Sequence, residues 1–294
     1  MLGYLQLLRL PTVFTALADI FLGYSLTHRE LDSPAAFGWL LLASAGLYLS
    51  GMVFNDVFDA RQDARERPGR PIPSGRVPMA AAIALGAALM LGGVVSAGQV
   101  GRPSLMVAGL LVAAILGYDG VLKRTPLGPL GMGACRFLNV MLGASDYQWW
   151  FALWARPQLV CAIGLGVYIV GVTWFARTEA RQSQRGQLLA ALAVLDLGLV
   201  VLAWLMCTWH GLGELLVALA LLTFIAASLN LRALAALRDP TPARVQGMVK
   251  LMLLNYVMVN ATLVYWKTGD GTYALATACL VIPAVWLGRY IPMT

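Results

Sequence analysis

The chain has 294 residues, of which 60% are hydrophobic and only 12% are charged, and its net charge is +7. Because a soluble domain carries about 25% charged residues, this composition excludes a disordered chain and a disulfide scaffold and all but excludes a water-soluble enzyme. The basic residues lie in short connections between apolar runs, so the positive charge does not indicate a nucleic-acid partner. The composition is typical of a polytopic membrane protein.

Ten apolar segments follow one another along the chain, and each has roughly the 20 residues that a helix needs to cross a bilayer. They lie near residues 12–27, 37–57, 78–98, 104–122, 127–145, 158–178, 188–209, 212–231, 247–266 and 273–290. The fifth segment is the weakest because it contains Arg136 and Asn139, so nine or ten spans are expected. We therefore predict an all-α fold, a polytopic transmembrane helical bundle that forms one domain over residues 1–294.

Basic residues are concentrated in alternate connections between these segments. The connections after the second, fourth, sixth and eighth segments hold Arg61, Arg65, Arg67, Arg70 and Arg76; Lys123 and Arg124; Arg177, Arg181 and Arg185; and Arg232, Arg238 and Arg244. The other connections hold Arg29, Arg102, Arg156, no basic residue, and Lys267. By the positive-inside rule, the first set faces the cytoplasm together with the N-terminus.

An acidic pattern closes the second apolar segment. Asp56, Asp59 and Asp63 share one stripe of a helix by their spacing, with Asn55 at its shoulder. Three like charges on one stripe repel each other, and Mg²⁺ relieves that repulsion because its ligands are carboxylate oxygens, waters and substrate phosphates. The alternative is a solvated helix end that enters a loop. Taken alone, the stripe leaves both interpretations open.

A basic loop follows directly, from Arg65 to Arg76, in which arginines alternate with proline and glycine. Such a stiff loop can hold guanidinium groups at fixed positions, and arginine forks match phosphate oxygens. The positive-inside rule alone would explain the charge, but it requires none of the proline and glycine spacing. Together, the stripe and the loop indicate a site for a metal and a diphosphate.

These elements resemble those of a known family. The pattern N-D-x-x-D-x-x-x-D over 55–63, followed by R-P-x-R-P-x-x-S-G over 67–75, resembles the first signature of the UbiA superfamily of intramembrane prenyltransferases. Three shorter elements are similar to family elements in the same order: Arg9-Leu10-Pro11-Thr12, the stretch from Tyr118 to Lys123, and the pair Arg136 and Asn139. The resemblance covers most of the chain and implies a bundle around a central cavity that is open to lipid.

The sequence departs from the family at its second acidic motif. The family carries a D-x-x-x-D pattern at the end of the sixth span, where this chain has Glu179 and Ser183. Three arginines, at 177, 181 and 185, surround these residues. This Ala-Arg-Thr-Glu variant resembles the EboC-like branch of the superfamily. Either the diphosphate is bound with less metal and more arginine, or the site binds an isoprenoid without catalysis.

The resemblance implies a Mg²⁺-dependent prenyltransferase that moves a polyprenyl group from an allylic diphosphate donor to a small-molecule acceptor within the membrane lipid. It implies Asn55, Asp56, Asp59, Asp63 and Glu179 as metal ligands, Asp56, Asp59 and Tyr118 as catalytic residues, and Arg67, Arg70, Lys123, Arg136 and Asn139 as diphosphate-binding residues. Asp19 is expected to line the same cavity from the first span. We expect a polar or hydroxylated acceptor, and a bacterial inner membrane with the active site on its cytoplasmic side.

Two other classes of function fit parts of the sequence. A non-catalytic protein that binds or delivers an isoprenoid diphosphate would explain the missing second carboxylate at Ser183. A transporter would require internal repeats with matching helix breaks in two halves, and the acidic stripe occurs only once.

Overall fold

The computed structural model describes residues 2–146, 153–155, 157–179 and 182–290, and all regular elements within them are helices. In chain order these are α1 (Leu2–Leu8), η1 (Leu10–Thr12), α2 (Val13–Thr27), α3 (Pro34–Glu66), α4 (Met79–Val100), α5 (Arg102–Gly120), η2 (Leu122–Arg124), α6 (Gly128–Gly143), α8 (Gln158–Ala176), α9 (Arg185–Thr208), α10 (Leu215–Arg238), α11 (Pro242–Thr268), α12 (Gly271–Cys279) and α13 (Val281–Leu287). The prediction of an all-α bundle is confirmed.

Eight helical stretches of the described residues are long and apolar enough to cross a membrane, the first of them being Gly3–Thr27, which joins α1, η1 and α2. The other two predicted spans are shorter: α6 has 16 residues, and the last segment is divided into α12 with 9 and α13 with 7. A helix rises about 1.5 Å per residue, so none of these three reaches the roughly 30 Å of a hydrocarbon core alone. All ten predicted segments are helical, but two of them fall short of a full span.

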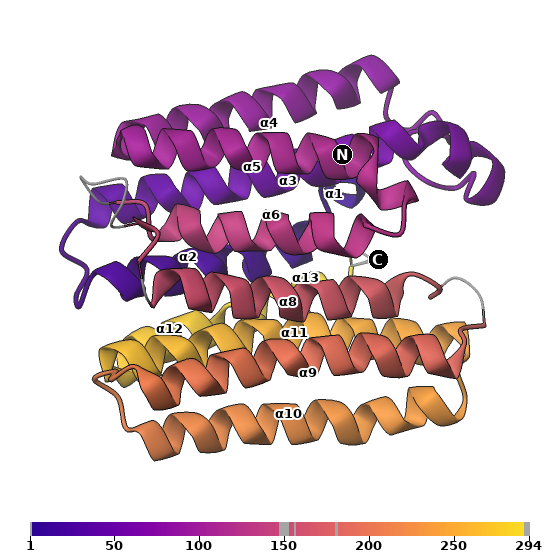
Figure 1. Cartoon of the computed structure of the whole chain (residues 1–294). Coiled ribbons are helices and arrows are strands. Elements are labelled where there is room, and N and C mark those ends of the chain that lie inside the picture. The colour runs from indigo at the N-terminus through magenta and orange to yellow at the C-terminus, as the bar shows by residue number, and fades with distance from the viewer. Residues whose placement is uncertain (1, 147–152, 156, 180–181, 291–294) are drawn as a thin grey trace.

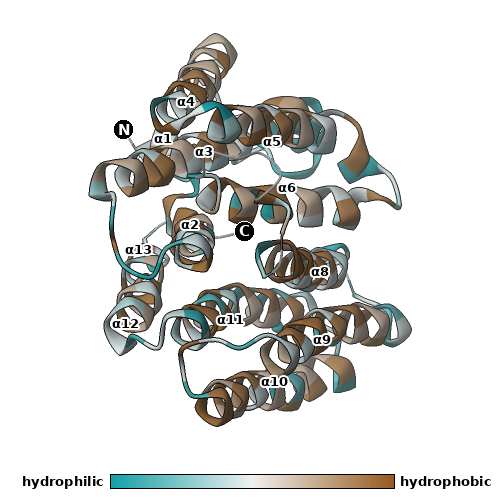
Figure 2. Cartoon of the chain, turned by 60° about the vertical axis from the view of Figure 1, so that its left-hand side comes forward, coloured by the Kyte–Doolittle hydropathy of each residue, from teal (hydrophilic) through white to brown (hydrophobic). Residues whose placement is uncertain are grey.

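The helices run alongside one another in two groups (Figure 1). α3, α4 and α5 pack together in the N-terminal group, α8 to α12 form the C-terminal group, and α2 and α6 contact each other between them. Hydrophobic residues cover most of the helices, and hydrophilic residues gather in the connections (Figure 2). One end of the bundle holds residues 9–12, the end of α3 and η2. We call it the acidic end.

Small residues let α2 and α6 approach closely. A Cβ added to Gly23 would lie 2.7 Å from the Cα of Gly143, and one added to Gly143 would lie 2.9 Å from the Cα of Ile20. No side chain fits between backbones at these separations. Close packing of this kind is a common basis of helix association in membranes, where lipid tails are as apolar as the side chains.

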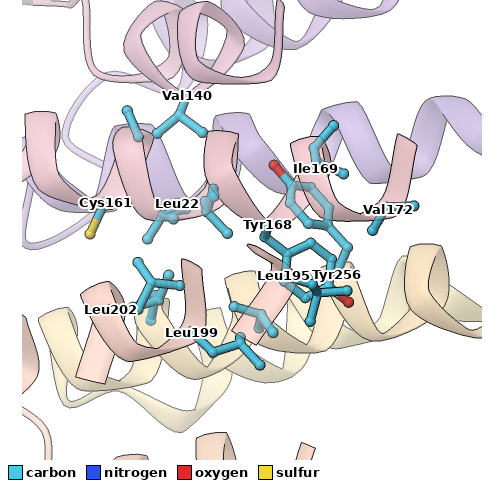
Figure 3. Close-up of a cluster of buried hydrophobic side chains, with 14 of the residues drawn as sticks. Leu22, Val140, Cys161, Tyr168, Ile169, Val172, Leu195, Leu199, Leu202 and Tyr256 are labelled. Carbon is cyan, nitrogen blue, oxygen red and sulfur yellow. The ribbon is translucent and has the colours of Figure 1, made fainter. Parts of the chain in front are cut away.

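The C-terminal group has a core of aliphatic and aromatic side chains (Figure 3). Tyr168 of α8 and Tyr256 of α11 are fully buried, and their rings lie 5.5 Å apart between centroids. The Tyr168 hydroxyl donates a hydrogen bond to the carbonyl oxygen of Met252 at 2.8 Å. This core joins α8, α9 and α11 and, through Leu22 and Val140, connects them to α2 and α6.

Candidate active site

The acidic stripe lies on one uninterrupted helix. α3 has 33 residues, so it extends about 50 Å, well beyond a hydrocarbon core of roughly 30 Å. It ends at Glu66 because Arg67 precedes Pro68, and proline disfavours helical backbone in the residue before it. The last turns of α3 therefore carry the acidic stripe to the end of the bundle, where the chain turns into the basic loop.

Asp56 and Asp63 point to the same side of α3 and share one arginine from the basic loop. Nη1 of Arg70 lies 2.8 Å from Oδ2 of Asp63 and 3.3 Å from Oδ1 of Asp56. Both carboxylates are buried. Arg70 therefore fixes the basic loop against the acidic stripe.

Arg9 holds Asp56 from the N-terminal segment. Its Nη2 lies 2.9 Å from Oδ1 of Asp56 and donates a hydrogen bond across 47 residues of sequence. Arg9 has a φ of 46° and a ψ of 47°, a left-handed backbone conformation that is rare for a residue with a side chain. Strain of this kind persists where the surrounding structure enforces it, often at functional sites. The short helix η1, which starts after Arg9 and contains Pro11, holds the turn in place.

Asp59 has different partners because it lies toward η2. Its Oδ2 is 2.8 Å from Nζ of Lys123, and its Oδ1 is 3.7 Å from Nη2 of Arg124. Lys123 Nζ also donates a hydrogen bond to the carbonyl oxygen of Asn55 at 3.2 Å. The stripe is thus divided into two groups: Asp56 and Asp63 with Arg9 and Arg70, and Asp59 with the basic residues of η2.

A small cavity continues from this point into the bundle between α3, α5 and α6. It has a volume of about 60 Å³ and is lined mainly by apolar side chains together with Asn55, Tyr118, Asp119, Arg136 and Asn139. The side-chain amide of Asn55 donates a hydrogen bond to Oδ1 of Asp119 at 2.8 Å, which links the cavity to the acidic stripe.

A larger, basic pocket lies beside Asp56, between α3, the N-terminal segment and the basic loop. It has a volume of about 280 Å³, and four arginines surround it together with Asp56: Arg9, Arg67, Arg70 and Arg76. Arg76 is positioned by Gln6 of α1, whose Oε1 accepts a hydrogen bond from Nη1 of Arg76 at 2.7 Å. Guanidinium groups that converge on one space favour an anion with several oxygens, such as a diphosphate.

Arg136 and Asn139 form a separate polar cluster deeper in the bundle. Nη1 of Arg136 lies 3.2 Å from Oδ2 of Asp19, and Nδ2 of Asn139 donates to the same oxygen at 2.9 Å. Nη2 of Arg136 donates to the hydroxyl of Thr15 at 2.6 Å, and the guanidinium lies 5.0 Å from the ring centre of Tyr48. Asp19 does not line the cavity but neutralises the arginine that does. A role of Arg136 and Asn139 in binding diphosphate remains a prediction.

The second acidic position, Glu179, lies near the basic pocket. Burial raises the pKa of its carboxyl above the usual value, although the nearby guanidinium groups of Arg67 and Arg9 oppose this effect. Oε2 of Glu179 is buried and accepts no hydrogen bond from the described residues. Ser183 is also buried, but its hydroxyl accepts a hydrogen bond from Thr178 at 2.6 Å and donates one to the Thr178 carbonyl at 3.2 Å. The Ser183 hydroxyl is therefore occupied by Thr178, whereas Glu179 offers an oxygen that has no partner among the described residues.

The donor chemistry of this end fits a hard divalent cation. Asp56, Asp59, Asp63 and Glu179 supply carboxylate oxygens, the ligands that Mg²⁺ prefers, and one buried oxygen of Glu179 has no hydrogen-bond partner among the described residues. Across the described part of the chain, however, no three His, Cys, Asp or Glu side chains lie close enough to hold a metal ion. Arg9, Arg70 and Lys123 instead neutralise the aspartates, so a cation would have to exchange places with them.

The structure brings most of the predicted site residues together at the acidic end. Asn55, Asp56, Asp59, Asp63, Arg67, Arg70, Lys123 and Glu179 lie there, Tyr118 lines the inner cavity, and Arg136 and Asn139 face the cavity from α6. The sequence prediction did not include Arg9, Arg76 or Asp119 among the site residues, although Arg76 closes the predicted basic loop. Arg9 and Asp119 both lie in stretches that resemble motifs of the family, so those motifs could have identified them as site residues.

The fold and this site define a class of protein: a polytopic helical membrane protein with carboxylates and converging arginines at one end of the bundle. The chain also matches the model of the UbiA prenyltransferase family over residues 16–254. It therefore belongs to the UbiA prenyltransferase family, and it is an integral membrane protein.

Several curated relatives of the chain share one name, digeranylgeranylglyceryl phosphate synthase. The chain is 31% identical over 155 residues to the digeranylgeranylglyceryl phosphate synthase of Metallosphaera sedula, covering 51% of this chain and 55% of the relative. It is 34% identical over 127 residues to the synthase of the same name from Methanopyrus kandleri, covering 43% and 46%. The chain thus spans about half the length of the curated relatives it matches.

Solved structures share the fold. A UbiA homolog from Archaeoglobus fulgidus, bound to DMAPP and Mg²⁺, has a TM-score of 0.68 at 14% identity and covers 94% of this chain and 99% of that chain. The apo structure of a UbiA homolog from Aeropyrum pernix K1 has a TM-score of 0.66 at 20% identity, with 86% and 96% covered. At these identities the likeness establishes the architecture of the bundle.

Proposed function

We propose that this protein transfers a polyprenyl group from an allylic diphosphate to a hydroxylated acceptor inside the membrane, with Mg²⁺ as cofactor. The observation that carries the proposal is the basic pocket beside Asp56, in which Arg9, Arg67, Arg70 and Arg76 converge on one space. Asp56 of α3 borders this pocket, and its neighbour Asn55 lines the inner cavity and donates a hydrogen bond to Asp119 there. Family membership supports the same reaction class.

The arginines of the basic pocket bind the diphosphate of the donor. In the reaction, the bond between C1 of the prenyl group and the diphosphate oxygen breaks, and the electron pair leaves with the diphosphate. Arg67, Arg70 and Arg76 hold positive charge where negative charge develops, which stabilises the transition state. Asp56, Asp59, Asp63 and Glu179 would hold Mg²⁺, which would neutralise further charge on the diphosphate. The resulting allylic cation is then open to attack.

The acceptor binds on the cavity side of α3. Its hydroxyl oxygen forms the new bond to C1, and its proton passes to a neighbouring carboxylate or to the released diphosphate. Asn55, Tyr118 and Asp119 surround the cavity nearest to the acidic stripe and orient the acceptor. The names of the curated relatives, which refer to a glyceryl phosphate, support a hydroxylated acceptor of the glycerol phosphate type.

The decisive experiment measures diphosphate release from purified protein in lipid nanodiscs. Labelled geranyl, farnesyl and geranylgeranyl diphosphates are supplied with and without Mg²⁺, first without an acceptor and then with glycerol 1-phosphate or a quinone precursor. We expect Mg²⁺-dependent release that is faster with the glycerol phosphate acceptor. Asp56→Asn and Asp59→Asn are each expected to lower the rate by about 10²- to 10³-fold, since each removes charge from the site.

Asp239→Asn is the matched control, because Asp239 is an exposed carboxylate whose ion-pair partner, Arg244, is also exposed. It should leave the rate unchanged. Tight binding of the labelled diphosphates without any release would contradict prenyl transfer and favour the non-catalytic binding protein. Release that is independent of Mg²⁺ would contradict the assignment of the cofactor.

A further inference from the structure

Both histidines of the chain lie in one pocket at the end of the bundle opposite the acidic end. The pocket has a volume of about 190 Å³, and His28, Arg29, His210 and Lys267 line it. These residues come from the end of α2, the connection between α9 and α10, and the end of α11. Segments that are far apart in sequence therefore bring four basic side chains to a single pocket, hereafter called the histidine pocket.

The positive charge of the histidine pocket has little compensation within the protein. Among the described residues, the side chains of Arg29, His210 and Lys267 form no hydrogen bond or ion pair, and Lys267 is half-buried. His28 alone faces a carboxylate, with its Nε2 3.7 Å from Oδ2 of Asp146. Arg29 and His210 are exposed, so the clustered basic side chains present an uncompensated positive potential that attracts an anion to the pocket.

The walls of the histidine pocket are held by tertiary contacts. The backbone N–H groups of Leu212 and Gly213 donate to the carbonyl oxygens of Lys267 and Trp266 at 3.3 Å and 3.0 Å, which ties the α9–α10 connection to the end of α11. The imidazole of His28 stacks on the ring of Tyr24, with 4.1 Å between ring centres. The connection and the imidazole are therefore held in place before any ligand binds.

An aromatic groove adjoins the histidine pocket and shares His28 and Arg29 with it. The groove has a volume of about 250 Å³, and the rings of Phe21, Tyr24, Phe37 and Tyr273 line it between α2, the start of α3 and α12. One exposed carboxylate, Glu30, also lines the groove. A basic pocket that opens beside an apolar groove matches a molecule with an anionic head and a hydrocarbon chain.

We propose that the histidine pocket and the aromatic groove together bind a phosphate-bearing lipid, with its phosphate among the basic side chains and its chain along the rings. The pocket lies where three spanning helices end, which is the depth of lipid headgroups, and arginine and lysine side chains bind phosphate oxygens through charge-assisted hydrogen bonds. Basic residues also complement the negative ends of helices. That effect, however, explains neither their convergence on one pocket nor the adjoining groove. This site is independent of prenyl transfer.

The test is a titration of the purified full chain in a phosphate-free detergent, followed by native mass spectrometry. The probes are dioleoylphosphatidic acid, the corresponding diacylglycerol without phosphate, and inorganic phosphate. Arg29→Gln and Lys267→Gln should each weaken phosphatidic acid binding by about tenfold, since each removes a charge-assisted hydrogen bond. Lys267→Arg keeps the charge and should retain binding, which guards against a loss caused by misfolding.

Arg102→Gln is the matched control, because Arg102 is exposed at the same end of the bundle but lies outside the pocket and the groove. It should change the affinity less than twofold. Equal weakening by all three Gln variants would overturn the proposal in favour of diffuse surface charge. Inorganic phosphate that binds as tightly as the lipid would also overturn it, as would diacylglycerol that binds as tightly as phosphatidic acid.

Discussion

At the scale of single residues, the helical repeat explains how the acidic stripe is divided. A helix turns by about 100° per residue, so Asp63 returns to within roughly 20° of Asp56, whereas Asp59 lies about 60° to one side. Asp56 and Asp63 therefore meet Arg70, and Asp59 meets Lys123. The spacing predicted a shared face, and the structure shows that this face meets two different sets of cations.

The buried pair of Asp19 and Arg136 gives a prediction at the same scale. Asp19→Leu leaves a buried guanidinium without its counter-ion and should lower the unfolding free energy by about 3–5 kcal/mol. Adding Arg136→Met removes the uncompensated charge, and stability should largely recover. The unfolding midpoint of both variants in detergent measures this effect.

The same pair of variants tests the role that the sequence assigned to Arg136. If Arg136 binds the diphosphate, the stable double variant should show a KM for the donor that is raised about tenfold, because one charge-assisted hydrogen bond is lost. A donor KM equal to that of the unchanged protein, together with recovered stability, would contradict diphosphate binding by Arg136 and leave it a structural role.

At the scale of elements, the contact between α2 and α6 depends on glycine. Gly23→Ala would bring a methyl group to 2.7 Å from the Cα of Gly143, and backbone cannot move aside as a flexible side chain would. We expect the unfolding free energy to fall by about 1–3 kcal/mol, the usual cost of overpacking. Thermal unfolding followed by intrinsic tryptophan fluorescence measures the change.

Gly92→Ala in α4 is the matched comparison, since a Cβ added there has nothing within 4 Å. Alanine has the higher helix propensity, so this variant should be neutral or more stable by up to about 1 kcal/mol. Equal destabilisation by both substitutions would mean that backbone flexibility, and not the close approach of α2 to α6, is what the glycines provide.

At the scale of the whole molecule, the candidate site joins segments that the membrane helices hold together. Arg9 precedes η1, Asp56 lies on α3, Arg70 lies in the basic loop, and Glu179 follows α8. A ligand that contacts all of them stabilises the folded state against separation of these segments. Binding at one end of the bundle should therefore raise the stability of the entire protein.

Geranylgeranyl diphosphate with Mg²⁺, at 100 times its dissociation constant, should stabilise the protein by about 2.7 kcal/mol by mass action. The unfolding midpoint should rise accordingly, and chelation of Mg²⁺ should reverse the rise. Asp56→Asn should abolish the shift while Asp239→Asn retains it. A shift of equal size in both variants would place the bound diphosphate away from the acidic stripe.

The sequence by itself determined the helical class, the ten helical segments and the family, because hydrophobic runs and short motifs are local properties of the chain. The pattern N-D-x-x-D-x-x-x-D over 55–63 and the arginines that follow it are also local, and they identified most of the residues that gather at the acidic end. The lengths of α6 and of α12 and α13 were not predictable, since apolar composition does not show where a helix breaks.

Only the tertiary structure decided which polar and charged side chains meet. Arg9 meets Asp56 across 47 residues, Asn55 meets Asp119 across 64, and Arg136 meets Asp19 across 117. The convergence of both histidines on one pocket is of the same kind. Such pairs depend on how helices pack and on which faces they present to each other, and a one-dimensional pattern of residues does not contain that information. Local sequence predicts the helices, whereas the packing of the helices determines the partner of each charged side chain.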